Sequence, residues 1–357
     1  MIKKECFTTE WIEQVSSELH YNDKNLIEKV IRALSLLEML VKAGCPLVFK
    51  GGTALMLILG KSAHRLSIDI DVICPPGTNI EDYLKSFADF GFINLELVER
   101  KQRDDADIPK SHSKFFYQIA YRNDTDAQSY ILLDVLYEDI HYFRTRQIAI
   151  DSPFIRIEGE PLMVSVPSAE DILGDKLTAF APNTTGIPYY KNGRSCSMEI
   201  AKQLYDVGRL FENVSGLQIT ADAFRKIAAV ELSYRSLGTD VGQVFHDIRQ
   251  TALCISTRGK AGEGDFDLIQ DGIIRVKAFM YKQRYLIDNA IIDAARAAYL
   301  ATLIEKGITE TEPYSNNPTD IKDLIIRPSL TNKLNKLKNN LPEAYYYWAK
   351  TSELLEA

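Results

Sequence analysis

The chain has 357 residues, of which 46% are hydrophobic, 25% charged and 10% aromatic, values typical of soluble globular domains. This composition excludes disordered, collagen-like and coiled-coil rod proteins, and the length suggests two domains. Lys and Arg number 42 against 49 Asp and Glu, giving a formal net charge of −7. A polynucleotide substrate would therefore need a local basic patch, because the overall charge of the protein would repel it.

Cysteine and histidine spacing argues against a disulfide framework and against zinc. The five cysteines are scattered without a C-x-x-C pair, and the five histidines show no H-x-x-x-H spacing. A bound metal would therefore be held by carboxylates. The N-terminus lacks an apolar signal stretch, and no run approaches the roughly 18 apolar residues of a membrane span. We predict a soluble, cytoplasmic protein without a membrane partner.

The first half of the chain carries both helix and strand signals. Apolar residues recur at helical spacing over 25–43. Residues 46–50 form a short β-prone run, which meets Gly51 and Gly52, and helical composition resumes at Thr53. The predicted local order is strand, glycine turn and helix.

The segment 66–74 (LSIDIDVIC) alternates strictly between apolar and polar residues. Alternation with a period of two is typical of a strand that has one buried face. It places Ser67, Asp69 and Asp71 together on the other face. This predicted strand therefore presents two carboxylates side by side.

The remaining signals complete a mixed domain over residues 1–165. A helix is predicted at 80–90, and the connection 99–114 is highly charged, as in a hairpin tip or surface loop. The predicted strands lie at 93–98, 115–121 and 130–137.

Beyond residue 165 helix signals dominate, and we predict a helical domain over 166–357. Ser168 fits the N-cap of a first helix that runs to Phe180. A loop covers 181–196, and 308–320 reads as a polar linker. Further helices are predicted at 197–212, 219–232, 238–253, 268–306 (with a break) and 331–356.

Three strand acids and a glycine turn together indicate metal-assisted chemistry. Asp69 and Asp71 lie about 6–7 Å apart along one strand, an arrangement that suits Mg²⁺ with substrate phosphates as its other ligands. Asp134 interrupts an apolar run, where an unpaired charge is costly unless it meets a metal or a partner. Glycines between a strand and a helix let phosphate oxygens approach the backbone. The combination predicts phosphoryl or nucleotidyl transfer, although D-x-D also occurs on solvated strand faces and Gly-Gly in ordinary turns.

Two segments resemble the signature of a known family. Residues 50–55 (KGGTAL) and 65–71 (RLSIDID) resemble the AbiEii/AbiGii toxin family of nucleotidyltransferases, which includes the MenT toxins and belongs to the DNA polymerase β-like superfamily. The resemblance continues in 167–177 (PSAEDILGDKL) and 202–209 (KQLYDVGR), and covers about residues 25–212.

The resemblance implies an α+β fold, with a polymerase-β-like palm built on a mixed sheet and followed by an α-helical C-terminal domain that completes the active-site cleft. It implies that Asp69 and Asp71 bind Mg²⁺, in a one- or two-metal site, with Asp134 as a third ligand or base. Lys176 would neutralise triphosphate charge, and Asp206 would complete the site. The NTP would be contacted by Lys50, Gly51, Gly52, Thr53, Arg65 and Ser67.

By the same resemblance, the protein would transfer an NMP from an NTP to an RNA 3′ end, with tRNA as the expected acceptor. Its role would be that of the toxin in a type IV-like toxin–antitoxin or abortive-infection system, with a cognate antitoxin as partner. Two other functions stay open. The acceptor could be a protein or small-molecule hydroxyl, or the chain could be a non-catalytic nucleotide-binding protein.

Several residues also have a plain structural interpretation. Lys176 fits a solvated helix residue that pairs with Glu170 or Asp175. Lys202, Asp206 and Arg209 share a helical face that is either exposed or lines a cleft. The loop 182–194 and the basic run of Lys333, Lys336 and Lys338 suit either RNA contact or ordinary solvated surface.

Overall fold

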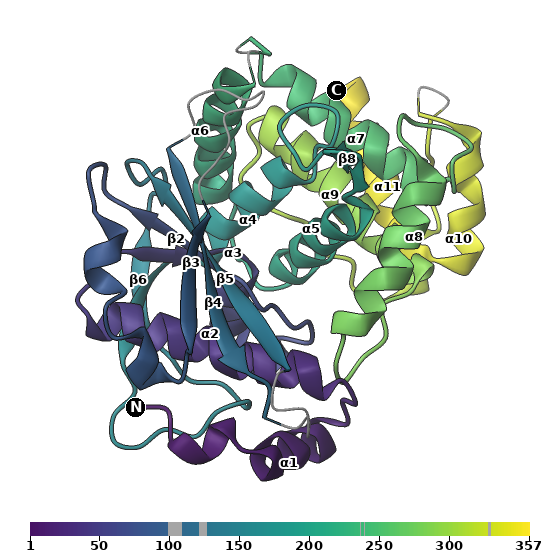
Figure 1. Ribbon diagram of the computed structural model, residues 1–357. Coiled ribbons are helices and arrows are strands. Elements are labelled where there is room, and N and C mark those ends of the chain that lie inside the picture. Colours follow the sequence, from purple (N-terminus) through teal and green to yellow (C-terminus); the bar gives the residue numbers. More distant parts are fainter. Residues whose placement is uncertain (99–108, 121–126, 236, 239, 328–329) are drawn as a thin grey trace. The chain divides into compact units, whose positions relative to one another are not determined.

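The computed structural model (Figure 1) describes residues 1–98, 109–120, 127–235, 237–238, 240–327 and 330–357. The chain divides into two units, which are described separately below. Unit 1 comprises Met1–Ser168 and Ala278–Arg284, and unit 2 comprises Ala169–Lys277 and Tyr285–Ala357. We predicted a helical domain over 166–357; within this range, Ala278–Arg284 belongs to unit 1.

Unit 1 is built on a five-stranded mixed sheet. The strand order is β1-β2-β5-β4-β3, and only the β2–β5 pair is parallel. The mixed sheet and the many helices confirm the predicted α+β class. The strands are β1 (Val48–Lys50), β2 (Ile70–Cys74), β3 (Asn94–Val98), β4 (Lys110–Gln118) and β5 (Gln128–Tyr137).

One face of this sheet forms the core of unit 1. Helix α2 (Lys24–Lys42) packs against β2 and β5, and its apolar residues are almost fully buried. The sheet contributes alternate residues of each strand, since side chains alternate between the two faces. The buried strand residues include Ile70, Val72, Phe115, Tyr117, Ile131, Leu133 and Val135.

The other elements of unit 1 are short. Helices α1 (Thr9–Leu19) and α3 (Gly51–Leu59) flank α2 and β1 in the sequence. Strands β6 (Thr145–Ala149) and β7 (Met163–Pro167) form a separate antiparallel pair that the sequence analysis did not predict. Four 3-10 turns complete the unit at Lys4–Phe7, Gly60–Ser62, Ile80–Tyr83 and Phe87–Phe90.

Three predictions for unit 1 need correction. The helix expected at 80–90 is two 3-10 turns, because aromatic side chains lower helix propensity and so short a helix is marginal. Strand β2 begins at Ile70 rather than residue 66, because the Leu66 amide donates to the Phe279 carbonyl (2.8 Å) and not to a sheet neighbour. The charged connection lies outside the described residues as far as 108, and from Lys110 it is part of β4.

Unit 2 is helical, with the predicted break in its longest helical segment between α8 and α9. Helix α9 packs against α5, α7 and α11 through a run of small, fully buried alanines, which allow close helix approach. Its α-helices are α4 (Ala169–Ala179), α5 (Ser197–Phe211), α6 (Gln218–Tyr234), α7 (Gly242–Ser256), α8 (Phe266–Val276), α9 (Ile287–Glu305), α10 (Leu337–Asn340) and α11 (Pro342–Glu356). It also contains an unpredicted hairpin of β8 (Tyr190–Lys191) and β9 (Arg194–Ser195), and 3-10 turns at Pro318–Ile321 and Asn332–Lys336. A further 3-10 turn, Lys277–Phe279, begins at the last residue of this segment of unit 2 and continues into unit 1.

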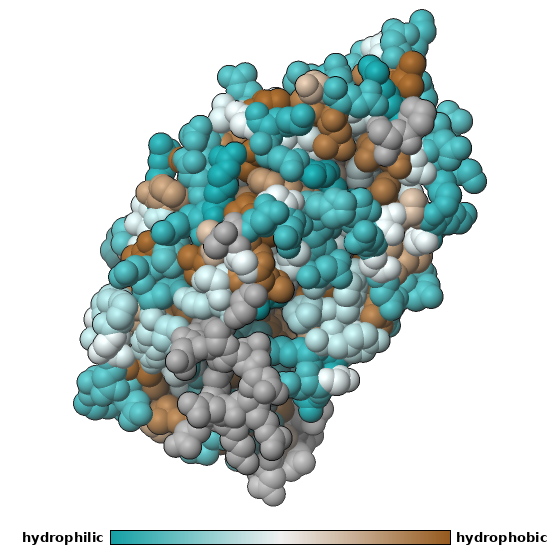
Figure 2. Space-filling model, turned by 90° about the horizontal axis from the view of Figure 1, so that it is seen from above, coloured by the Kyte–Doolittle hydropathy of each residue, from teal (hydrophilic) through white to brown (hydrophobic). Residues whose placement is uncertain are grey.

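The surface is mixed in character. Figure 2 shows hydrophobic side chains in small patches among hydrophilic ones on the face that it presents, as on most folded proteins. Within the described ranges, none of the helices combines the length and the apolarity that crossing a membrane requires.

Candidate active site

The two acids of the D-x-D motif lie at the start of β2 in unit 1. Asp69 directly precedes β2 and is exposed, while Asp71 is the second residue of β2 and is half-buried. Ile70 and Val72, which alternate with them, are buried in the core. The alternation read from the sequence therefore places both carboxylates on the side away from the core.

Strand register brings further polar residues beside Asp71. Lys50 of β1 and Asp134 of β5 are the Cα partners of Asp71, and His112 of β4 is the partner of Asp134. Paired residues on neighbouring strands project to the same face of a sheet. Lys50, Asp71, Asp134 and His112 thus form a polar row across four strands.

Asp134 has a partner that the sequence analysis missed. Its carboxylate contacts His112 Nδ1, and the two side chains are 33% and 26% exposed. Asp134 is therefore not a buried charge, because the strand period sends Leu133 and Val135 into the core and Asp134 to the other face. No local pattern around His112 indicated this role, since it depends on the pairing of β4 with β5.

Two carboxylates, those of Asp69 and Asp71, are the candidate ligands for a metal ion at this site. No cluster of three or more His, Cys, Asp or Glu placed to hold a metal ion occurs among the residues that the structure describes. Asp69 and Asp71 nevertheless supply the hard oxygen donors that Mg²⁺ takes when substrate phosphates and water provide its other ligands. The donor set fits Mg²⁺ bound together with a nucleotide.

The glycine turn lies in contact with the segment that carries the acids. Gly51 has a φ of +78°, and a Cβ there would lie 2.1 Å from Asp71 Oδ2. A Cβ on Gly52 would lie 2.7 Å from Ser67 Oγ and 3.0 Å from Arg65 Nη2. Both positions therefore need glycine, because any side chain would displace the polar groups opposite. The motifs at 50–55 and 65–71, which are separate in the sequence, are in direct contact in the structure.

Helix α3 begins at this turn and adds its own polarity. Its first backbone amides have no partner within the helix, and its dipole favours an anion at this end. Thr53 Oγ1 donates a hydrogen bond to the Asp69 carbonyl (2.7 Å), which ties the acid segment to the helix. The arrangement places a helix start, whose dipole favours an anion, beside two carboxylates.

In unit 2 the two residues implied by the resemblance meet each other. Lys176 Nζ of α4 lies 3.0 Å from Asp206 Oδ2 of α5, and the side chains are only 9% and 2% exposed. The interpretation of Lys176 as a solvated residue that pairs with Glu170 or Asp175 is therefore wrong: tertiary packing encloses this face of α4. Such a pair is retained against a substantial desolvation penalty.

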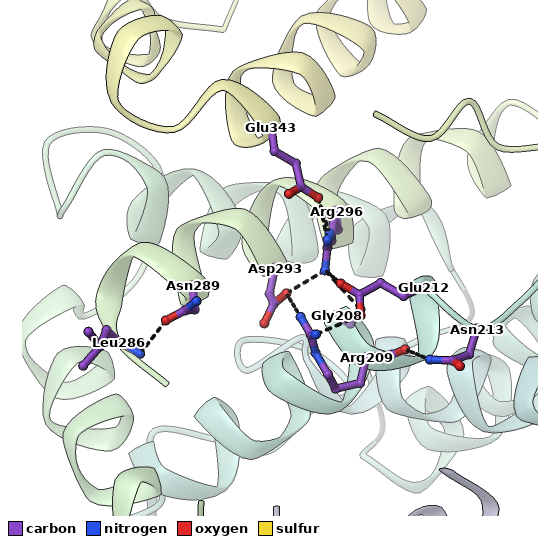
Figure 3. Close-up of polar contacts among 9 residues, drawn as sticks. All are labelled: Gly208, Arg209, Glu212, Asn213, Leu286, Asn289, Asp293, Arg296 and Glu343. Carbon is purple, nitrogen blue, oxygen red and sulfur yellow. Dashed lines mark hydrogen bonds and ion pairs between the residues drawn. The ribbon is translucent and has the colours of Figure 1, made fainter. Parts of the chain in front are cut away.

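A buried ionic network supports helix α5 one turn beyond Asp206 (Figure 3). Arg209 bonds Glu212 (2.8 Å) and Asp293 of α9 (3.4 Å), and Arg296 bonds Asp293 (3.3 Å) and Glu343 of α11. Burial raises the pKa of the Asp293 carboxyl to about 6, against the lowering effect of the two arginines. Arg209 is thus a structural ion-pair residue of α5.

The tight packing at Asp293 also explains a glycine in α5. A Cβ on Gly208 would lie 2.0 Å from Asp293 Oδ1, and the Gly208 carbonyl accepts a hydrogen bond from Arg296 (3.3 Å). No local pattern predicted this network, because its members lie on helices far apart in the chain.

Comparison with known proteins identifies the family. The sequence model for "Nucleotidyl transferase AbiEii toxin, Type IV TA system" matches residues 34–299, about three-quarters of the chain. The chain therefore belongs to the AbiEii family of toxin nucleotidyltransferases, and the family expected from its two motifs is confirmed. It is an enzyme of the nucleotidyltransferase class, with a polymerase-β-like fold.

Solved structures show only distant similarity. JHP933 from Helicobacter pylori is 16% identical, with 83% of this chain and 94% of that chain covered and a TM-score of 0.40. MenT4, a nucleotidyltransferase toxin from Mycobacterium tuberculosis H37Rv, is 12% identical, with 94% and 98% covered and a TM-score of 0.42. No curated protein sequence matches the chain significantly.

Proposed function

We propose that this toxin is a Mg²⁺-dependent enzyme that moves an NMP from an NTP to the 3′ end of an RNA, with tRNA as the expected substrate class. It would act in the cytoplasm and be neutralised by a cognate antitoxin. The observation that carries the proposal is the close contact of Gly51 with Asp71 and of Gly52 with Arg65 and Ser67. This contact joins an anion-binding turn to the metal-binding acids.

The chemistry follows from the positions of these groups. The first amides of α3, together with Lys50 and Arg65, would bind the triphosphate, and Asp69 and Asp71 would hold Mg²⁺, which neutralises charge on the reacting phosphate when it is bound. The 3′ oxygen of the acceptor forms a bond to the α-phosphorus, and the bond from that phosphorus to the bridging oxygen breaks, which releases pyrophosphate. Asp134, oriented by His112, would accept the proton of the attacking hydroxyl.

We further propose a catalytic role for Lys176. Its ammonium would offset triphosphate charge while Asp206 fixes its position. The support is chemical: a lysine and an aspartate buried together at 3.0 Å form a costly arrangement that stability alone does not favour.

The direct test is transfer of label from each α-labelled NTP to total cellular RNA in the presence of Mg²⁺. Asp69→Asn and Asp71→Asn should each reduce transfer by at least about 100-fold, whereas Asp89→Asn, an exposed acid of the same unit, should leave it unchanged. Chelation of divalent ions should abolish transfer, and added Mg²⁺ should restore it.

Other outcomes would change the conclusion. Label on protein or on a small molecule instead of RNA would replace the proposed acceptor. Nucleotide binding without transfer to any acceptor would show a non-catalytic binding protein.

A further inference from the structure

The hairpin β8–β9 in unit 2 is an ordered element with a defined turn (labelled β8 in Figure 1). Asn192 and Gly193 have φ values of 51° and 74°, the left-handed pair that a two-residue type I′ turn requires. Lys191 pairs with Arg194, and Tyr190 pairs with Ser195. Because paired residues share a face, the two cations project together and Tyr190 projects to the opposite side.

Polar contacts hold the loop that leads into the hairpin, and a backbone hydrogen bond closes the hairpin base. The Asp247 carboxylate, which is 4% exposed, accepts hydrogen bonds from Asn183 N (2.9 Å), Asn183 Nδ2 (2.7 Å) and Thr184 Oγ1 (2.8 Å). The Cys196 amide donates to the Tyr189 carbonyl (2.9 Å) and closes the ladder. Burial of the Tyr189 ring raises the pKa of its hydroxyl to about 12. The residues that precede and follow the hairpin are therefore held in place by packing and hydrogen bonds.

The side chains at the tip of the hairpin are exposed. Tyr190 is 57% exposed, and Lys191 and Arg194 are exposed. Among the described residues, neither cation forms an ion pair, and the Tyr190 ring has no aromatic or cationic neighbour. Like charges directly opposite each other destabilise a strand pair. Two adjacent cations on a chain of net charge −7 therefore point to an anionic ligand that relieves their repulsion.

We propose that this hairpin binds single-stranded RNA, with phosphates against Lys191 and Arg194 and a base stacked on Tyr190. The combination of a charged backbone and flat bases is specific to nucleic acid, and it matches an exposed aromatic ring on one face of the hairpin with two cations on the other better than an acidic peptide does. The inference rests on the proposed RNA acceptor and names the element of unit 2 that recognises it.

The test measures binding without turnover. Fluorescence anisotropy would follow a fluorescein-labelled single-stranded RNA added to the full chain carrying Asp69→Asn and Asp71→Asn. Changing Lys191 and Arg194 to Ala should weaken binding at least about tenfold and reduce the slope of log Kd against log salt by about 1.4, the value expected for two lost phosphate contacts to a single strand.

Further variants test the contribution of stacking and control for the loss of positive charge. Tyr190→Ala should weaken binding about tenfold, and Tyr190→Phe should not, because stacking needs only the ring. Lys226→Ala with Lys306→Ala removes the same charge from exposed sites of unit 2 and should preserve both affinity and salt slope. Asn192 and Gly193 stay in place throughout, so that the turn still forms.

Failure of this inference is distinguishable from failure of the proposed function. With intact acids, Lys191→Ala and Arg194→Ala should raise the KM for RNA and leave the KM for the NTP unchanged. Normal transfer to RNA, with hairpin variants that match the wild type in affinity and salt slope, would overturn the hairpin inference alone. Equal affinity of the wild type for polyglutamate would replace RNA with an acidic protein as the ligand. Absence of transfer by the wild type to any acceptor would refute the proposed function itself.

Discussion

At the scale of single residues, the site depends on how closely a backbone approaches a carboxylate. Asp71 Oδ2 occupies the space that a Cβ of Gly51 would need, and the φ of +78° at Gly51 is one that other residues adopt only with strain. The glycine thus serves two requirements at once, conformational and steric. The position of Asp71 is set by the absence of a side chain at Gly51.

Gly51→Ala should therefore inactivate the enzyme with only moderate destabilisation. A displacement of Asp71 by about 1 Å is expected to reduce NMP transfer on the order of 100-fold, and the left-handed φ should cost about 1–2 kcal/mol of stability. Gly44→Ala is the matched control, since its φ is +74° and nothing lies within 4 Å of the added Cβ. Gly44→Ala should lose about the same stability from the left-handed φ and should keep full transfer activity. Equal activity of the two variants in a transfer assay would contradict the role given to the Gly51 contact.

At the scale of elements, α5 is held by ion pairs on two neighbouring helices. Asp206 pairs with Lys176 of α4, and Arg209, one turn later, pairs with Asp293 of α9. Removal of one partner from a buried pair leaves an uncompensated charge, which costs more than loss of the pair as a whole. Stability and activity should therefore respond differently to single and double substitutions.

Lys176→Met should destabilise unit 2 by about 3–5 kcal/mol, because Asp206 is left buried without its ammonium partner. Adding Asp206→Leu should recover much of that stability, yet NMP transfer should remain lost in both variants if the pair serves catalysis. Urea unfolding followed through Trp348, together with the transfer assay, separates the two effects. Recovery of activity along with stability in the double variant would assign the pair a purely structural role.

The raised pKa of Asp293 predicts a pH-dependent stability of unit 2. Because its pKa rises from 3.8 to about 6 on folding, the native state binds more protons than the unfolded state between these values. The stability contributed by this group is fully present below about pH 4 and is lost as the pH rises through about 6. Relative to Asp293→Asn, the free energy of unfolding should fall by on the order of 2 kcal/mol between about pH 4 and pH 7. A difference that is flat or rises with pH, measured by urea unfolding, would disprove this assignment.

At the scale of the whole molecule, each unit has its own core and its own fluorescent probe. Of the two tryptophans, Trp11 lies buried in unit 1 and Trp348 lies buried in unit 2. The segment Ala278–Arg284 belongs to unit 1, where the Tyr281 amide donates to the His64 carbonyl (2.9 Å) and its ring packs edge-on against Phe154. The fold of unit 1 therefore requires residues that follow α8 in the sequence.

Tyr281→Ala should accordingly destabilise unit 1, although it lies between two helices of unit 2 in the sequence. Loss of a ring that is 2% exposed is expected to cost about 3–5 kcal/mol. The unfolding transition reported by Trp11, in a Trp348→Phe background, should shift to lower urea concentration. In unit 2, Phe224→Ala removes the ring stacked on Phe245 and should act on the Trp348 transition. If Tyr281→Ala shifted only the Trp348 transition, the assignment of Ala278–Arg284 to unit 1 would be wrong.

Local sequence patterns were enough to predict the family, the α+β class and the two motifs of unit 1, because these depend on local periodicity and on short runs such as KGGTAL and RLSIDID. The alternation predicted both acids on one strand, whereas β2 begins at Ile70 and Asp69 directly precedes it. Only the tertiary structure decided that Asp134 pairs with His112, that Lys176 is buried against Asp206, and that Ala278–Arg284 belongs to unit 1. The pairing of β4 with β5, the packing of α4 on α5 and the position of Ala278–Arg284 all depend on contacts between residues far apart in the sequence. No local pattern of side chains specifies which distant residue makes such a contact.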